Sequence, residues 1–298
     1  MPLQKGCASV PVVTRPWSPP PASADDRVGV CPIISALSTT PHLVLEGEGG
    51  LDDVVLPVAS FLVRAGGNLF LVDAGVAAAE RRALPAGAAD LVMGFAYSPA
   101  ASVAAQLAGA GIRSAQLAAV LLTHAHLDHA GELEDLPGVP VVLSEPEAQS
   151  LGALPAPVRD FSTGRAAAAW QLLAARMRVV RFPEGPLAAV DILPGGAMSL
   201  RFTPGHTPGS MSVVVSSAGG TEVMLGDAAL SARHVRDLVK KGPGGRVLDA
   251  DPELAWRTVN RLHAWMDGHP DWRLRAAHDE QAVRERFRFR ACARDLLR

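Results

Sequence analysis

Apolar runs of strand length, separated by glycine and aspartate residues, cover most of the chain after its first fifty or so residues. The runs 54–67 and 68–75 predict a hairpin. A buried strand is predicted over 117–124, where the apolar run ends directly at His124. Six further segments predict strands: 140–144, 177–182, 198–202, 211–217, 221–227 and 273–278.

Helical segments alternate with these strands. Alanine and leucine at helical spacing, with a serine start and a glycine stop, predict a helix over 98–112. Another helix is predicted to begin after Ser144, where acidic residues suit a first turn. Residues 151–177 predict a loop plus helix inserted between strands, which often shapes the mouth of a pocket. Further helices are predicted over 228–240, 252–267 and 281–298.

This order of elements falls into two comparable halves, which suits two sheets packed face to face with helices outside. A chain of 298 residues with 48% apolar residues can fill one such core, so residues 28–298 are predicted to form a single domain. Residues 1–27 are rich in Pro, Ser and Ala and predict a flexible arm, with a dimer strap as the alternative.

Charge, hydropathy and cysteine usage exclude several classes of protein. The formal net charge of −2 leaves no basic excess to attract nucleic acid. No stretch reaches the roughly 18 to 20 uncharged apolar residues of a membrane span, and the first residues lack the apolar region of a secretory signal. We therefore expect a cytoplasmic protein with no membrane partner. Cys7, Cys31 and Cys292 are odd in number and far apart, so we expect reduced thiols and no cysteine-built metal site.

The segment THAHLDHAG, residues 123–131, gathers four side chains of metal-binding type: His124, His126, Asp128 and His129. Imidazole nitrogen and carboxylate oxygen are zinc ligands, and an HxH step puts two imidazoles on the same side of an extended chain. Since only nine of the 298 residues are histidine, three within six positions favour a metal site over a solvated polar loop.

Three later segments each end a predicted strand with another residue of this type. His206 lies between two Pro-Gly turns, Asp227 directly follows an apolar strand, and His278 ends a short strand. Any one of them could equally be a turn residue or a cap. As a series, they could all line one sheet edge.

Taken in order, these residues resemble the metallo-β-lactamase superfamily, with its HxHxDH segment, a later His, a later Asp and a last His. The likeness includes LVDAG, with Asp73, and covers about residues 55–280. It implies the four-layer αβ/βα fold of that superfamily, an α/β (α+β) architecture of two packed sheets with helices outside.

The resemblance also implies two zinc ions, although Fe, Mn or Co suit the same ligand types. It assigns one ion to His124, His126 and His206, the other to Asp128, His129 and His278, and a bridge to Asp227. Two cations lower the pKa of a shared water to about neutrality, which makes hydroxide the nucleophile. Asp128 is then the expected catalytic proton shuttle. Asp73 is expected to orient a ligand histidine, with a turn-forming role as the alternative.

Within the superfamily the chain looks most like the acyl-homoserine lactone lactonases, which implies a lactonase with a quorum-quenching activity. Those lactonases often carry a tyrosine soon after the bridging aspartate, whereas this chain has Leu230 and only one tyrosine, Tyr97. Phosphotriesterase or arylesterase activity is therefore an alternative. Glyoxalase II shares the ligand series, and iron-dependent dioxygenases share the scaffold, so these two activities are further alternatives. A non-enzymatic binding module is the least favoured interpretation.

The expected partner is a small-molecule substrate, and a homodimer is an open alternative to a monomer. The substrate pocket is expected to form from the loop 93–99, the insertion 151–177 and the region after Leu230, and four residues are candidates for substrate contact. They are Phe95, Tyr97, Trp170 and Leu230.

Overall fold

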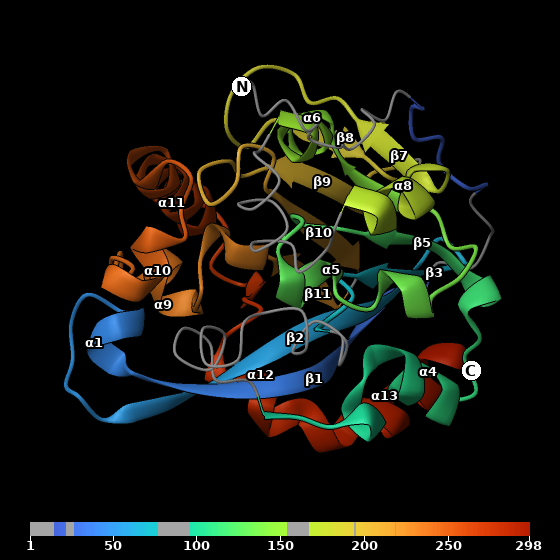
Figure 1. Ribbon diagram of the computed structural model, residues 1–298, viewed down its shortest axis with the longest axis horizontal. Coiled ribbons are helices and arrows are strands. Elements are labelled where there is room, and N and C mark those ends of the chain that lie inside the picture. Colours follow the sequence, from blue (N-terminus) through green and yellow to red (C-terminus); the bar gives the residue numbers. More distant parts are fainter. Residues whose placement is uncertain (1–14, 22–26, 77–95, 154–166, 194, 218) are drawn as a thin grey trace, which may run out of the picture.

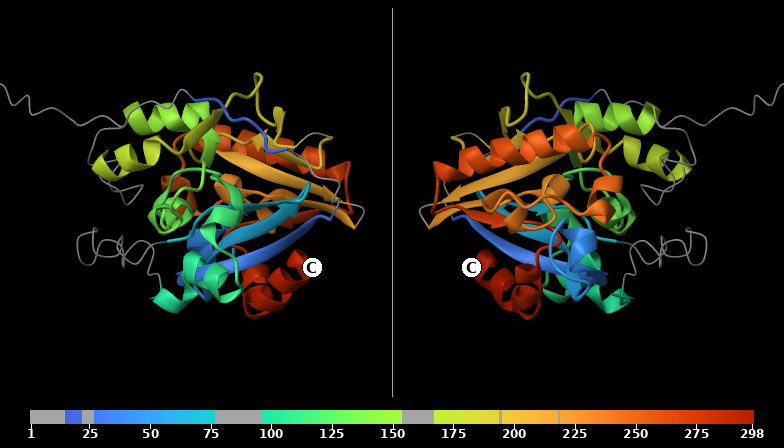
Figure 2. Two further views of the ribbon diagram at one scale, coloured as in Figure 1. Left: turned by 90° about the vertical axis from the view of Figure 1, so that its right-hand side faces the viewer. Right: turned by 90° about the vertical axis from the view of Figure 1, so that its left-hand side faces the viewer.

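The computed structural model describes residues 15–21, 27–76, 96–153, 167–193, 195–217 and 219–298. Two β-sheets lie at its centre and helices cover their outer sides (Figure 1). The side views show helix α11 (Pro252–Asp267), in orange, on one side of the sheets and the red C-terminal helices on the other (Figure 2). This is the predicted four-layer arrangement. No helix in the described ranges is long and apolar enough to cross a membrane.

The first sheet has seven strands in the order β4-β1-β2-β3-β5-β6-β7. Their bounds are β1 Gly29–Pro41, β2 Asp53–Ala65, β3 Asn68–Val72, β4 Ala96–Tyr97, β5 Leu117–Leu121, β6 Val141–Ser144 and β7 Met177–Val180. Strands β1, β2 and β3 pair antiparallel, whereas β3, β5, β6 and β7 run parallel. The carboxyl ends of β3 and β5 therefore meet at one edge of the sheet.

The second sheet has five strands in the order β12-β11-β10-β9-β8. Their bounds are β8 Ala189–Asp191, β9 Met198–Phe202, β10 Met211–Ser217, β11 Gly220–Met224 and β12 Arg273–Arg275. Only β11 and β12 pair parallel among these strands, so the segments that follow them also leave the sheet at a shared edge.

The helices fall into groups that cover the two outer faces. Besides α11, their bounds are α1 His42–Leu45, α4 Val103–Gly109, α5 Leu127–Ala130, α6 Glu145–Ala153, α8 Ala167–Ala174, α9 Ala232–Arg236, α10 Pro243–Val247, α12 Glu280–Glu285 and α13 Phe289–Leu297. Short 3-10 turns occupy Pro99–Ala101, Ser114–Gln116, Leu133–Asp135, Gly226–Ala228 and Arg286–Arg288.

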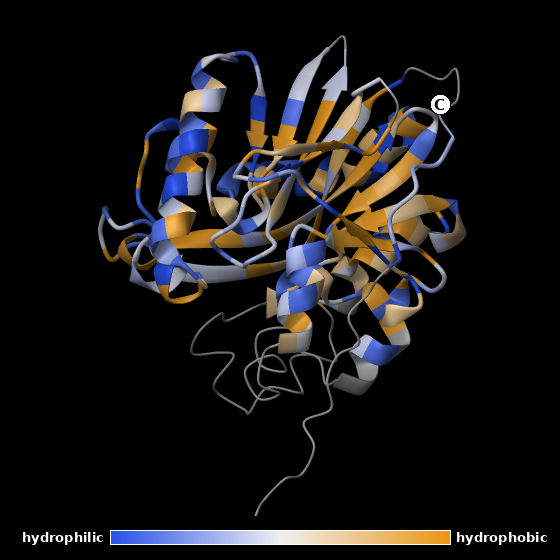
Figure 3. Ribbon diagram, turned by 90° about the horizontal axis from the view of Figure 1, so that it is seen from above, coloured by the Kyte–Doolittle hydropathy of each residue, from blue (hydrophilic) through white to orange (hydrophobic). Residues whose placement is uncertain are grey.

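Alternation along the strands divides the core into layers. In β2, Leu62 faces the core under α4, α6, α8 and α13, whereas Phe61 and Val63 face the space between the sheets. In β10, Val213 faces that same space and Val214 faces α9 and α11. Seen from above and coloured by hydropathy, the strands are mainly orange and the helices carry blue outer faces (Figure 3).

Most of the predicted elements are confirmed, including the hairpin β2–β3 and the helix over 252–267. The helix predicted over 228–240 is wrong in extent, because only 232–236 is α-helical. The C-terminal helix is interrupted by the turn at 286–288. Residues 154–166 of the expected insertion lie outside the described residues. The thirteen-residue strand β1 is not predicted by the hydrophobic pattern.

Of the expected N-terminal arm, residues 1–27, the structure describes residues 15–21 and residue 27. Its Trp17 backbone N–H donates to the carbonyl oxygen of Val179 at 2.9 Å, so this stretch lies along β7. The Trp17 side chain packs, partly buried, against the core between the sheets.

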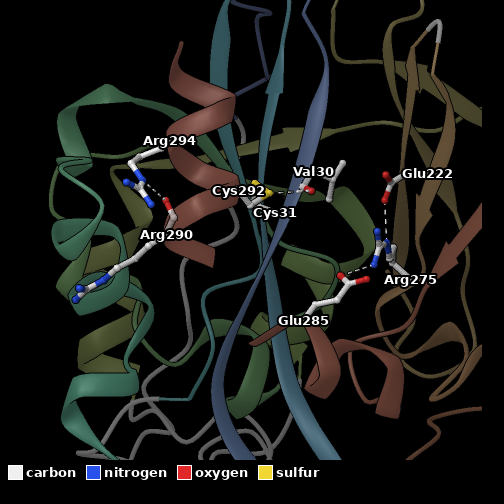
Figure 4. Close-up of a disulfide and its surroundings, with 8 residues drawn as sticks. All are labelled: Val30, Cys31, Glu222, Arg275, Glu285, Arg290, Cys292 and Arg294. Atoms are coloured by element: carbon white, nitrogen blue, oxygen red, sulfur yellow. Dashed lines mark hydrogen bonds and ion pairs between the residues drawn. A yellow bond between two sulfur atoms is a disulfide. The ribbon is translucent and has the colours of Figure 1, made fainter. Parts of the chain in front are cut away.

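Cys31 of β1 and Cys292 of α13 form a disulfide with a Cα–Cα distance of 5.8 Å (Figure 4). The expectation of reduced thiols is therefore wrong for these two residues. They are 261 positions apart in sequence and meet only because α13 returns to pack on β1. Cys7 lies outside the described residues.

Candidate metal centre

The histidine-rich segment begins where β5 ends and turns at once into α5. His124 and His126 follow the strand in an extended stretch, and His126 is the N-cap of α5. The change to helix carries Asp128 and His129 to the same side as His124, whose ring centroid is 4.1 Å from that of His129. The fold thus brings together the four side chains that the motif predicts.

Three further side chains reach this segment from the second sheet. His206 comes from the β9–β10 connection, and Asp227 lies in the 3-10 turn after β11. His278 follows β12, the parallel neighbour of β11, so it shares the sheet edge with Asp227. Glycine at 226 is required here because a Cβ would lie 2.6 Å from Thr123 Oγ1, where the two sheets' loops meet.

The seven side chains form three overlapping groups. Within each group the possible ligand atoms lie within 4.8 Å of one another. The groups are His124, His126 and His206; His124, His129 and Asp227; and Asp128, His129 and His278. The first and last are the two ligand sets that the resemblance implies, and the middle group connects them through Asp227.

Asp227 faces both sides of the cluster with different oxygens. Its Oδ1 lies 3.2 Å from Nε2 of His129 and 3.2 Å from Nε2 of His278. Its Oδ2 lies 3.4 Å from Nε2 of His206. A carboxylate in this position can bind one cation with each oxygen, as expected of a bridging ligand.

Several buried polar atoms of this cluster lack hydrogen bonds, which is typical of a site that binds metal ions. Within the described residues, Nε2 of His124, Nε2 of His129 and Oδ1 of Asp227 are buried and lack a hydrogen-bond partner. Two of these atoms, Nε2 of His129 and Oδ1 of Asp227, lie 3.2 Å apart as an ion pair. Since an unsatisfied buried polar group costs about 1 to 3 kcal/mol, such atoms converging in one place fit divalent cations, which take these donors as ligands.

Burial and neighbouring charges shift the pKa values of the cluster histidines in opposite directions. Burial, reinforced by the adjacent imidazoles, holds the pKa of His124 and His126 well below the usual value, and burial also lowers the pKa of His206. Burial acts the same way on His129 and His278, but the surrounding carboxylates, Asp227 foremost and Asp128 with it, together outweigh burial and raise the pKa of both. Cations would replace the protons that the carboxylates attract, because metal ligation requires neutral imidazole.

Asp73, at the end of β3, makes the contact expected of an orienting residue. Its Oδ2 lies 2.8 Å from Nδ1 of His129, which leaves Nε2 of that ring for the centre. The same carboxylate accepts hydrogen bonds from the Thr123 backbone N–H and hydroxyl at 2.8 and 2.9 Å. Asp73 has a left-handed φ of 59°, so it is also the turn residue of the alternative interpretation.

Sequence reasoning misses three buried residues beside the centre. Asp249 lies 2.9 Å from Nδ1 of His206, and Lys241 donates to Asp249 at 2.7 Å. Glu147 of α6 accepts from the Ala125 backbone N–H at 2.9 Å and from the Thr207 hydroxyl at 2.6 Å, so it joins the two histidine loops. None stands in a motif, and the acidic first turn of α6 is the only local signal.

The candidates for substrate contact have different outcomes. Trp170 is fully buried in the core beneath α8, so the expectation that it lines a pocket is wrong. Phe95 lies outside the described residues. Tyr97 is in β4, where its backbone pairs with Ala36. Leu230 is buried, and its side chain approaches Gly245 of α10.

Comparison with known proteins identifies the family and agrees with the fold. The family model of the metallo-beta-lactamase superfamily matches residues 53–271, and the chain belongs to this superfamily. A gamma-lactamase, MBL2, of Gibberella moniliformis is 28% identical over an alignment of 193 residues, which covers 55% of this chain and 77% of the relative. The chain is thus a metal-dependent hydrolase by family and by its candidate ligands.

Solved structures share the fold at low sequence identity. An N-acyl homoserine lactone hydrolase with product bound at its catalytic metal centre has a TM-score of 0.67 and 19% identity, over 87% of this chain and 95% of that one. The hydrolase AbOPH has a TM-score of 0.60 and 19% identity, over 87% and 89% of the two chains. A dizinc quorum-quenching lactonase has a TM-score of 0.57 and 13% identity, over 89% and 91%.

Proposed function

We propose that this chain is a dinuclear metal-dependent hydrolase that opens a lactone ring in a small molecule. The observation that carries the proposal is Asp227, whose two oxygens face different histidine groups. The metal ligands are proposed to be the seven predicted residues, and the ions to be zinc, although Fe, Mn or Co use the same ligand types. When bound, the ions would supply a water of lowered pKa and stabilise negative charge on the attacked carbonyl oxygen.

The protein's own residues prepare the site for that chemistry. The lowered pKa values of His124, His126 and His206 keep these rings neutral, as ligation requires. Asp128 is buried, and its Oδ2 lies 3.4 Å from Nε2 of His278. We assign to Asp128 the transfer of a proton from the attacking water to the leaving ring oxygen. The ring C–O bond breaks and a hydroxy acid forms.

A cyclic acyl compound is supported as the substrate class by two relatives. The name of MBL2 refers to gamma-lactams, and the structural neighbours include N-acyl homoserine lactone hydrolases. A lactone and a lactam of the same ring size differ in the leaving atom, so a gamma-lactam is the second candidate. We further propose that residues 28–298 act as one domain on a free small molecule, without nucleic acid or membrane, as a monomer or homodimer.

Metal analysis and a substrate panel test the proposal. Purified protein should contain about two zinc-like ions per chain. The panel comprises acyl-homoserine lactones, gamma-lactams, aryl esters, phosphotriesters and thioesters, each with and without chelator. We expect chelator-sensitive ring opening of the lactones to be fastest. Turnover limited to phosphotriesters or thioesters would refute the lactonase assignment, and iron with oxygen consumption would refute hydrolysis as the main reaction.

A further inference from the structure

Lys241 and Asp249 form a buried ion pair directly behind the candidate metal centre. The Lys241 Nζ lies 2.7 Å from Asp249 Oδ1, and the two side chains are 6% and 3% exposed. Taking both charges out of water costs several kcal/mol per ion, so a buried pair of this kind is weak evidence for a stabilising role. Its contacts instead connect it to two of the proposed metal ligands.

Each partner of the ion pair contacts a different proposed ligand residue. The same Oδ1 atom of Asp249 lies 2.9 Å from Nδ1 of His206. Lys241 Nζ also donates a hydrogen bond of 2.8 Å to the backbone carbonyl oxygen of Asp227. One lysine therefore holds both the carboxylate behind His206 and the main chain of the bridging aspartate.

The direction of the Asp249 contact sets the tautomer of the His206 ring. An imidazole whose Nδ1–H donates to a carboxylate presents the lone pair of Nε2 on its other side. In His206 this Nε2 lies 2.9 Å from Nδ1 of His126 and 3.4 Å from Oδ2 of Asp227, inside the cluster. Asp249 thus aims the ligand atom of His206 at the centre.

The backbone around Asp249 fixes the His206 loop as well. The Ala250 backbone N–H donates to the carbonyl oxygen of His206, and that of Asp251 donates to the carbonyl oxygen of Gly205, both at 2.9 Å. A Cβ at position 205, where φ is 133°, would lie 2.3 Å from Cα of Ala255. The loop therefore sits tightly on the start of α11, with its imidazole held from behind.

The other ligand histidines have different partners. His129 meets Asp73, whose carboxylate is otherwise bonded to Thr123, and His278 meets the backbone carbonyl oxygen of Pro57 at 2.8 Å. Of these three orienting groups, only Asp249 shares its charge with a buried lysine. A carboxylate whose charge is partly neutralised raises the basicity of its histidine ring less than an isolated carboxylate does, so the two ion positions are electrostatically unequal.

We propose that Lys241 and Asp249 are positioning residues that build the ion position formed by His124, His126 and His206, separately from the second position. The inference rests on the proposed dinuclear function. Asp249 orients His206, while Lys241 fixes the position of the Asp249 carboxylate relative to the main chain of Asp227. Removing Asp249 should weaken that one ion position and leave the ion held by Asp128, His129 and His278 in place.

The test uses the variants Asp249→Leu, Lys241→Met and the double variant on the full chain. Zinc affinity is measured by competition with a chromogenic chelator, and each ion environment is followed by the absorption spectrum of the cobalt-substituted protein. We expect Asp249→Leu to lower the affinity for one of the two ions about 10- to 100-fold. The second affinity and its cobalt bands should stay unchanged.

The double variant separates positioning from simple stability. Each single variant leaves a buried charge without its partner and should lower the urea midpoint, whereas the double variant removes both charges and should recover much of it. If positioning is the role, the double variant still binds one ion weakly. Recovery of both stability and zinc affinity would overturn the inference in favour of a structural ion pair.

Matched controls are Lys240→Met and Asp237→Leu, which alter an exposed lysine beside Lys241 and an exposed aspartate after α9. Both should bind zinc as the wild type does. Wild-type protein that binds no divalent ion would overturn the proposed function and this inference together. Wild-type protein with two ions, combined with unchanged affinities in Asp249→Leu, would overturn this inference alone.

Discussion

At the scale of single residues, the proposed two-ion centre depends most on Asp227. We expect Asp227→Ala to lose one ion and most activity, because neighbouring cations repel when no carboxylate lies between them. Loss of an outer-shell partner typically costs about 10- to 100-fold, so loss of this ligand should lower kcat/KM by more than about 100-fold. Metal analysis and turnover measure both effects. Two retained ions would contradict the bridging role of Asp227, and wild-type turnover with a single ion would point to a single-ion mechanism.

Asp73 combines an electrostatic and a conformational role, which two substitutions can separate. Asparagine tolerates the left-handed φ of 59°, so the Asp73→Asn variant should fold normally. Its neutral amide should form a weaker hydrogen bond with Nδ1 of His129 than the carboxylate does. We expect zinc affinity about 10- to 100-fold lower for one ion, measured by chelator competition. Asp73→Ala adds backbone strain and should also lower the denaturation midpoint. Equal midpoints for the two variants would contradict the conformational part.

The sequence predicts the candidate metal ligands, which the fold brings together, but not the residues that contact them from behind. His124 to His129 are contiguous, and His206, Asp227 and His278 each follow a strand, so strand patterns alone align them at one edge. The contacting residues have no comparable pattern. Asp249 follows a short helix and acts on a residue 43 positions earlier in sequence, so its role arises only when α10 and the His206 loop meet.

At the scale of elements, Glu132 links α4 to the loop after the metal motif. Its two carboxylate oxygens accept hydrogen bonds from the backbone N–H groups of Val103 and Ala104, at 2.9 and 3.0 Å, in the first turn of α4. Burial nonetheless raises the pKa of Glu132 to about 7, because it outweighs these hydrogen bonds, and Asp135 adds to the shift.

This raised pKa predicts a pH-dependent stability of defined sign. Between the usual glutamate pKa of 4.5 and about 7, the folded protein keeps the Glu132 proton that the unfolded chain releases. The free energy of unfolding should therefore fall across this range, by up to about 1.4 kcal/mol per pH unit, and level off above it. Urea midpoints of wild type and Glu132→Gln, measured from pH 5 to 8, isolate the contribution. Parallel profiles for the two proteins would show that Glu132 does not titrate in this range.

Strand β1 escapes prediction because it is buried on both faces. Ile33 lies in the core under the helices and Ile34 in the core between the sheets, and the pairing register shifts between Ile34 and Ala36. Alternation is therefore lost. The segment also contains Pro32, which is disfavoured within strands, and the polar residue Ser35, although both are buried. These residues weaken the sequence pattern of a strand.

At the scale of the whole molecule, the disulfide joins the first long strand to the last helix. Figure 4 shows the bond between Cys31 and Cys292, near an ion-pair network in which Arg275 contacts Glu222 and Glu285. Disulfides persist mainly in oxidising compartments, so this bond counts against the expected cytoplasmic location. The cysteine count alone could not reveal the pair, because pairing depends on the returning path of α13.

The bond closes a loop of 261 residues, so its removal should raise the conformational entropy of the unfolded chain substantially. We expect Cys292→Ser to lower the free energy of unfolding by about 2 to 5 kcal/mol, measured by urea denaturation without reductant. Reductant should lower the midpoint of the wild type and of Cys7→Ser, a matched control that keeps the bond, and leave Cys292→Ser unchanged. Native oxidised protein should then expose at most one reactive thiol, since only Cys7 is outside the bond. A wild-type midpoint that does not respond to reductant would mean that packing of α13 on β1, rather than the covalent bond, holds the end of the chain.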